Sequence, residues 1–82
     1  MPAISRFYGI VIKMFFNEHN PPHFHVVYGE YVGSFNINNG EMTEGDLPKK
    51  ARALVSEWLA LHKNELIEIW NTQEYRSLPP LE

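Results

Sequence analysis

Hydrophobic and polar residues follow a strand-like pattern in the first half of the chain and a helical spacing in the second half. Residues 7–16 are rich in β-branched and aromatic side chains, contain no strand breaker except Gly9, and predict a first strand. Residues 23–28 and 31–37 predict two further strands. Residues 41–43 are a candidate fourth strand, because turn-forming residues lie on either side of them.

Gly29-Glu30 predicts a two-residue hairpin between the second and third strands, because glycine stands where a type II′ turn requires it. Counting outward from this turn assigns the facing pairs. The pairs expected on the core side are Tyr28 with Tyr31, Val26 with Gly33, and Phe24 with Phe35. The pairs expected on the opposite side are Val27 with Val32, His25 with Ser34, and His23 with Asn36. The opposite side is therefore polar at one end.

Helical periodicity dominates residues 47–75, where Asp46 is the expected N-cap and Pro48 lies in the first turn. The apolar stripe comprises Ala51, Leu54, Val55, Trp58, Leu59, His62, Leu66, Ile69 and Trp70. Extra apolar residues around His62-Lys63-Asn64 leave open whether this is one helix or two. Residues 77–82 are a tail that begins near the helix-ending Pro79-Pro80.

The order of these elements predicts an α+β fold. We expect a single domain over residues 1–82, because the length allows one modest core. It comprises a three- or four-stranded antiparallel β-meander followed by one long or two short C-terminal helices packed on one sheet face. One sheet and one helical layer leave a sheet face uncovered, which makes association with another chain or homo-oligomerisation an expectation of the fold.

Charge and composition argue against several classes of protein, namely general nucleic-acid binders, cysteine-based zinc or disulfide proteins, and membrane proteins. The net charge is -3, so electrostatic attraction to nucleic acid would need a local patch. The run 49–52, Lys-Lys-Ala-Arg, is the only basic cluster, and we interpret it as a solvated helix face because no aromatic stacking motif accompanies it. The absence of cysteine excludes disulfides and thiolate zinc sites. Without an apolar run of bilayer length, we expect a soluble, cytoplasmic protein.

The densest chemical signal is the segment 19–25, His-Asn-Pro-Pro-His-Phe-His, which is preceded by Glu18. His23 and His25 lie two residues apart on a strand and therefore project to one face. Together with His19 they are the candidate catalytic residues, or the ligands of a divalent metal such as zinc. The candidate binding residues beside them are Glu18, Ser34 and Asn36. The alternative interpretation is that these histidines only stabilise the loop or face solvent.

Several of these segments together resemble the small bacterial family known as domain of unknown function 4160. The segments are Ile4-Ser5-Arg6-Phe7-Tyr8-Gly9-Ile10, His19-Asn20-Pro21-Pro22-His23-Phe24-His25-Val26, Tyr28-Gly29-Glu30-Tyr31, and Leu47-Pro48 leading to Trp58 and His62. The resemblance implies a short stand-alone bacterial protein, often encoded beside another small protein in a pair that looks like a toxin–antitoxin module. It implies no settled activity and no catalytic residues.

Two functional hypotheses follow. The first is a toxin–antitoxin-like component that acts by associating with a small cognate protein, with the histidine patch on the binding surface. The second is a small metal-assisted or acid/base hydrolase or nuclease that uses His23 and His25, assisted by His19 and Glu18. The enzyme hypothesis requires these side chains to converge in a concave site, whereas association tolerates a flat surface.

Overall fold

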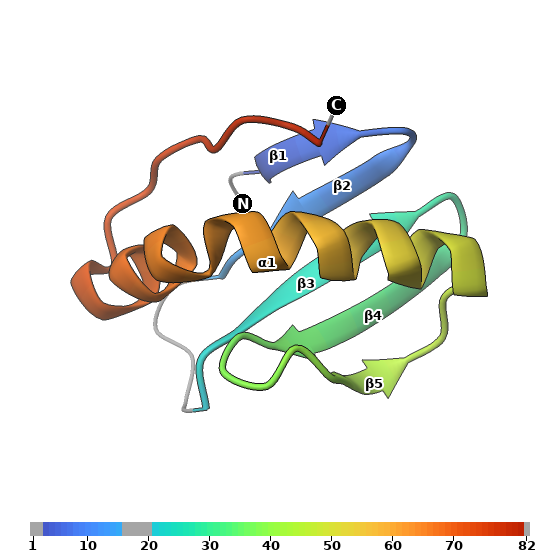
Figure 1. The fold of residues 1–82 in the computed structure, drawn as a ribbon, viewed down its shortest axis with the longest axis horizontal. Helices are drawn as coiled ribbons and strands as arrows, with labels where there is room; N and C mark the ends of the chain where they lie inside the picture. The colour runs from blue at the N-terminus through green and yellow to red at the C-terminus, as the bar shows by residue number, and fades with distance from the viewer. Residues whose placement is uncertain (1–2, 16–20, 82) are drawn as a thin grey trace.

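The computed structural model describes residues 3–15 and 21–81 as a five-stranded antiparallel sheet covered on one face by a single long helix (Figure 1). The strands follow one another in the sheet in chain order, so every neighbouring pair is sequential. The elements are β1 (Ala3–Phe7), β2 (Ile10–Lys13), β3 (His23–Tyr28), β4 (Tyr31–Asn36), β5 (Met42–Gly45) and α1 (Lys49–Thr72). The α+β class is confirmed, but the prediction of three or four strands is wrong.

The fifth strand arises because the predicted strand over residues 7–16 is in fact part of a hairpin. Tyr8 and Gly9 turn the chain with φ of 49° and 81°, so both central residues have the positive φ of a type I′ turn. Phe7 consequently faces Ile10, and β1 begins earlier than predicted, at Ala3. Gly9 therefore marks a turn rather than an interruption within one strand. The last residue of the predicted strand, Phe16, lies outside the described residues.

The β3–β4 hairpin has the predicted register at all six pairs, from His23 with Asn36 to Tyr28 with Tyr31. Gly29 has a φ of 60°, as the first central residue of a type II′ turn requires. Phe24 and Phe35 lie on the core side, where their rings stack with centroids 5.6 Å apart. The hairpin thus fixes which side chains face away from the core.

The helix begins later than predicted, and Asp46 is not its N-cap. The N-cap residue is Pro48, which makes no side-chain capping hydrogen bond. Asp46 instead extends the edge of the sheet, because its backbone N–H donates to the carbonyl oxygen of Val32 over 3.0 Å. The fourth predicted strand is present but displaced, since β5 covers Met42–Gly45 rather than 41–43.

The helix α1 is one element with a kink at His62, where φ and ψ are -122° and 16°. This answers the question of one helix or two, and the kink lies where the sequence pattern shifts. Gln73, in the left-handed conformation, ends the helix short of the predicted residue 75. No helix in the described part of the chain is long and apolar enough to cross a membrane, while the cytoplasmic location stays a prediction.

The core lies between α1 and the inner face of the sheet, and the C-terminal tail closes it beside β1 (Figure 1). The Leu78 N–H donates to the Ile4 carbonyl over 2.9 Å, and the Trp58 Nε1–H donates to the Pro79 carbonyl over 2.9 Å. The side chains of Leu78 and Leu81 are buried. The tail therefore completes the core and covers the edge strand β1.

Candidate functional site

The sheet face opposite α1 carries two cross-strand rows, which we call the outer face. The polar row runs across four strands, with Lys13 beside His25, His25 beside Ser34, and Ser34 beside Glu44. The apolar row beside it comprises Val11, Val27 and Val32, and Val32 is 58% exposed. In the described chain no helix lies on this face (Figure 1). The predicted polar patch is therefore one part of a wider mixed surface.

The outer face is hollowed around His25. A shallow cavity of about 380 Å³ is lined by side chains of both rows, and the Lys13 and Glu44 ends of the polar row border it. Phe15 packs edge-on against the His25 ring, with centroids 4.5 Å apart. The His25 Nδ1 lies 3.2 Å from the Ser34 hydroxyl oxygen, and either atom can donate the hydrogen bond. The predicted pair of His25 and Ser34 thus forms the middle of the hollow.

This surface also includes Lys13, Phe15 and Glu44, which the sequence pattern did not indicate. Lys13 and Phe15 could not be placed on this surface from the sequence, because no short turn sets the register of β2 against β3. Glu44 lies one residue beyond the predicted fourth strand. The turn at Tyr8-Gly9 would have shown that β2 starts at Ile10, but the pairing of Lys13 with His25 is seen only in the fold.

His23 lies close to His25 but is held mainly by its surroundings. The two ring centroids are 5.2 Å apart, and the His23 ring also packs 5.1 Å from the buried Trp70. Because a carbonyl only accepts, the His23 Nδ1 donates to the Pro21 carbonyl oxygen over 2.8 Å. In the neutral ring this places the lone pair on Nε2, the nitrogen that would bind a metal or a proton.

The remaining predicted site residues do not join one described cluster. The Asn36 side-chain oxygen accepts the backbone N–H groups of Asn38 and Asn39 over 2.8 and 3.3 Å, so it shapes the following turn. His19 and Glu18 lie outside the described residues. Over residues 3–15 and 21–81, no three His, Asp or Glu side chains form a group that could hold a metal ion.

A family model described as Domain of unknown function (DUF4160) matches residues 9–71, from the first hairpin turn to the last turn of α1. The chain belongs to the DUF4160 family. Comparison with curated proteins and with solved structures found no match. The DUF4160 match covers β2 to β5 and most of α1, so the outer face lies inside the matched region.

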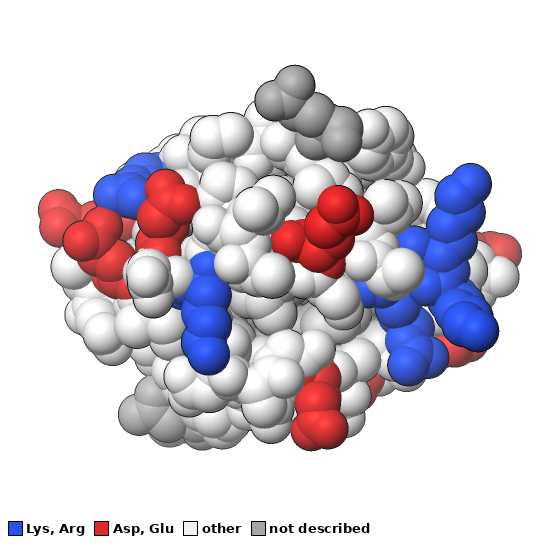
Figure 2. Space-filling model, in the orientation of Figure 1, with Lys and Arg blue, Asp and Glu red and all other residues white. Residues whose placement is uncertain are grey.

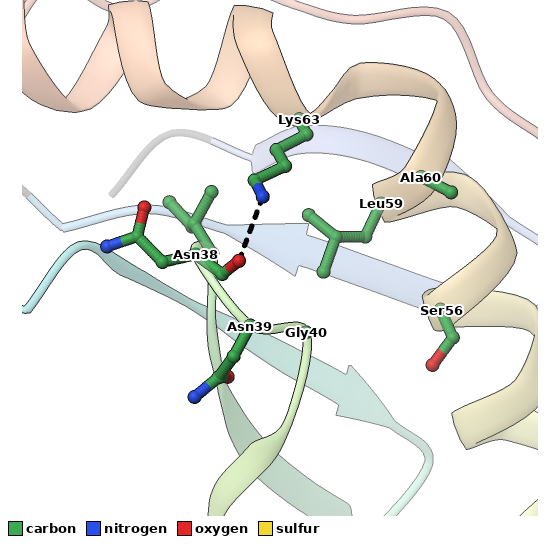
Figure 3. A pocket seen from close by; sticks show the side chains of 8 residues that line it. Asn38, Asn39, Gly40, Ser56, Leu59, Ala60 and Lys63 are labelled. Carbon is green, nitrogen blue, oxygen red and sulfur yellow. Dashed lines mark hydrogen bonds between the residues drawn. The ribbon is translucent and has the colours of Figure 1, made fainter.

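A second hollow of the DUF4160 chain lies between the turn after β4 and the middle of α1 (Figure 3). Lys63 reaches across it and donates to the Asn38 carbonyl oxygen over 2.8 Å. The Asn39 side-chain oxygen accepts the Glu41 N–H over 2.9 Å. These polar groups are engaged within the turn and with the helix, so the contacts serve to join α1 to the sheet.

The fourth histidine, His62, lies on the other side of the DUF4160 domain from His25. Its Nδ1 donates to the Glu65 carboxylate over 2.7 Å, and this hydrogen bond is the main cause that lowers the pKa of Glu65. Arg76 pairs with Glu65 and with Glu68 over 3.2 and 2.8 Å. The cluster links the helix kink to the tail and is separate from the outer face.

Proposed function

We propose that the protein is a protein-binding component of a toxin–antitoxin-like pair, and that the outer face binds a small cognate protein. One observation carries the proposal: a hollowed, mixed polar and apolar sheet face that no helix of the described chain covers. The valine row, in which Val32 is exposed and Val11 and Val27 are half-buried, supplies apolar contact area, and the aligned polar groups fix the register of the complex. Protein interfaces that are not permanent combine apolar and polar surface in this way.

The charges specify the chemistry of the partner. Lys13 and Glu44 mark opposite ends of the polar row, with His25 and Ser34 between them. A matching surface needs apolar side chains over the valine row, an acid near Lys13 and a base near Glu44. Complementary charges of this kind orient a complex and disfavour incorrect partners.

A second copy of the chain also meets these requirements. If the copy is turned over about an axis parallel to the strands, its polar row runs in the opposite direction. Lys13 of each copy then faces Glu44 of the other, and the two valine rows come together. This self-complementary arrangement favours homodimerisation when the cognate protein is absent.

Charge reversal tests which association occurs. Lys13→Glu and Glu44→Lys are each expected to weaken binding about tenfold or more, because like charges then face each other. The double variant should restore a homodimer but not a complex with another protein. The measurement is molecular mass by light scattering, for the protein alone and co-expressed with its genomic neighbour.

Lys63→Glu is the matched control, because Lys63 lies on the helical side of the molecule. This variant should leave unchanged the molecular mass of the protein alone and that of its complex with the neighbouring gene product. A monomer that fails to co-purify with the neighbouring gene product would contradict the proposal. So would complexes that all three outer-face variants leave intact.

The hydrolase or nuclease hypothesis has one specific observation in its favour, the 5.2 Å separation of the His23 and His25 rings. If the pair binds a metal, untagged protein should contain zinc or another divalent metal near one equivalent, and the His23→Ala/His25→Ala variant should lose it. Elemental analysis of both proteins measures this. Equal, negligible metal in the two would reject the metal-assisted version.

A further inference from the structure

We propose that the end of the molecule where α1 begins binds single-stranded nucleic acid, with Tyr8 stacking on a base and the helix-start cations contacting phosphates. This surface is distinct from the outer face. Nucleic-acid binding here and protein binding by the outer face can therefore be tested independently. It combines residues that the sequence keeps far apart. We call it the basic–aromatic surface, and it comprises Tyr8, Tyr28, Lys49, Lys50 and Arg52.

The cations gather where the helix starts. Figure 2 shows Lys and Arg side chains clustered at the end of the molecule where α1 begins. Lys49, Lys50 and Arg52 are exposed, and the first turn contains no acidic residue. In the described part of the chain, none of the three forms an ion pair. The positive end of the helix dipole repels them, so their placement weakens the helix and calls for another explanation.

Tyr8, at the same end of the molecule, is also in an unfavourable state, because its backbone conformation is strained. It has a positive φ of 49°, a conformation that suits glycine or asparagine in a type I′ turn and strains a bulky residue. Its side chain is 60% exposed, so burial does not offset the strain, although its ring makes an edge contact with Phe7 at 6.4 Å. Strained residues that persist on a surface indicate a functional constraint.

Tyr8 and one of the three cations meet in one hollow, whereas Lys49 and Arg52 line a separate hollow on the same helix. Tyr8, Tyr28 and Lys50 line a cavity of about 320 Å³ beside the first turns of α1. Tyr28 also packs against the first hairpin, because a side chain at Gly9 would lie 3.5 Å from its ring. In the sequence no aromatic motif accompanies these cations, which is why the run 49–52 reads there as a solvated helix face. The fold brings the tyrosines to them.

Single-stranded nucleic acid is the ligand class that uses both features. A flat aromatic side chain stacks on any base, and neighbouring cations bind the phosphates. The local patch provides attraction that the net charge of -3 does not. Glu57 also lines the hollow and opposes a polyanion, so removing its charge should strengthen binding.

Fluorescence anisotropy with labelled ten-nucleotide thymidine and uridine strands tests the proposal, and the stronger ligand identifies DNA or RNA. If three cations each contact a phosphate, a plot of the logarithm of the binding constant against the logarithm of the salt concentration should have a slope of about -2.

Tyr8→Asn should weaken binding at least about fivefold, yet raise the Tm by about 2–5 °C because asparagine suits the turn. Lys50→Glu should also weaken binding and raise the Tm.

The matched control is Lys63→Gln, which removes a cation about 20 Å along the same helix and should leave affinity unchanged. Glu57→Gln should bind more tightly than the unmodified protein. Four results would overturn the proposal. They are no binding at low salt, unchanged affinity of a folded Tyr8→Asn variant, an equal loss with Lys63→Gln, and equally tight binding of a duplex of the same length.

Discussion

Replacing Trp58 with alanine is expected to remove a large part of the stability of the domain. Trp58 is fully buried, its ring packs 5.7 Å from that of Phe7 and 6.0 Å from that of Phe24, and its indole N–H holds the tail at Pro79. Truncation of a buried tryptophan costs about 3–5 kcal/mol, whereas small domains have only about 5–15 kcal/mol to lose. Urea unfolding followed by circular dichroism measures the change.

Two further variants separate the sources of this effect. Trp58→Phe retains an aromatic ring but loses the bond to Pro79, so we expect a smaller loss of about 1–2 kcal/mol. Leu61→Ala alters an exposed leucine of the same helix and should change stability by less than about 0.5 kcal/mol. If Trp58→Ala unfolded at the same urea concentration as Leu61→Ala, the assigned core would be wrong.

Replacing Gly45 with alanine should detach β5 from the sheet. A Cβ at this position would lie 2.6 Å from the Gly33 Cα and still closer to the Val32 carbonyl oxygen, and both are backbone atoms that cannot rotate away. The φ of 90° adds strain for any L side chain. We expect a loss of roughly 2–4 kcal/mol and faster exchange of the Asp46 amide, which bonds to Val32.

Gly29→Ala is the matched control for this clash. Gly29 also has a positive φ, of 60°, but a Cβ there would meet nothing within 4 Å. It should therefore show only the conformational cost, about 1 kcal/mol. Equal losses in the two variants would mean that the close approach of β4 and β5 is incorrect. Because β5 carries Glu44, Gly45→Ala should also weaken association through the outer face.

The central hairpin could be predicted in detail because its signals are local. Gly29 fixes the turn type, and the two-residue period of a strand then determines every facing pair. The helix could also be predicted from the sequence, because its apolar residues from Ala51 to Trp70 recur at helical spacing. The kink fell where the stripe shifted, at His62.

The first hairpin, the helix start and the role of the tail were not predicted, since each depends on tertiary contacts or an unusual turn. Tyr8 is a poor residue for positive φ, so Tyr8-Gly9 carried little turn signal. Asp46 resembles an N-cap in sequence, but its N–H bonds to Val32 across the sheet. Nothing local shows that Leu78 bonds to Ile4 at the other end of the chain.

The candidate site was predicted only in part, because some of its residues follow from local signals and others from tertiary contacts. The positions of His23, His25, Ser34 and Asn36 followed from the central hairpin, and the structure has them in that register. Lys13 and Glu44 joined the polar row only when the pairing of β2 and β5 was known. The basic–aromatic surface could not be predicted at all, because the first hairpin and the helix start meet only in the fold.

The valine methyl groups offer the most direct test of the outer face as a binding surface. The chain has five valines, of which Val11, Val27 and Val32 lie on the outer face and Val26 and Val55 in the core. In methyl NMR spectra recorded with increasing concentrations of the cognate protein, or of the chain itself, we expect the three outer-face signals to shift and the two core signals to stay. A complex that forms without moving Val11, Val27 and Val32 would contradict the account.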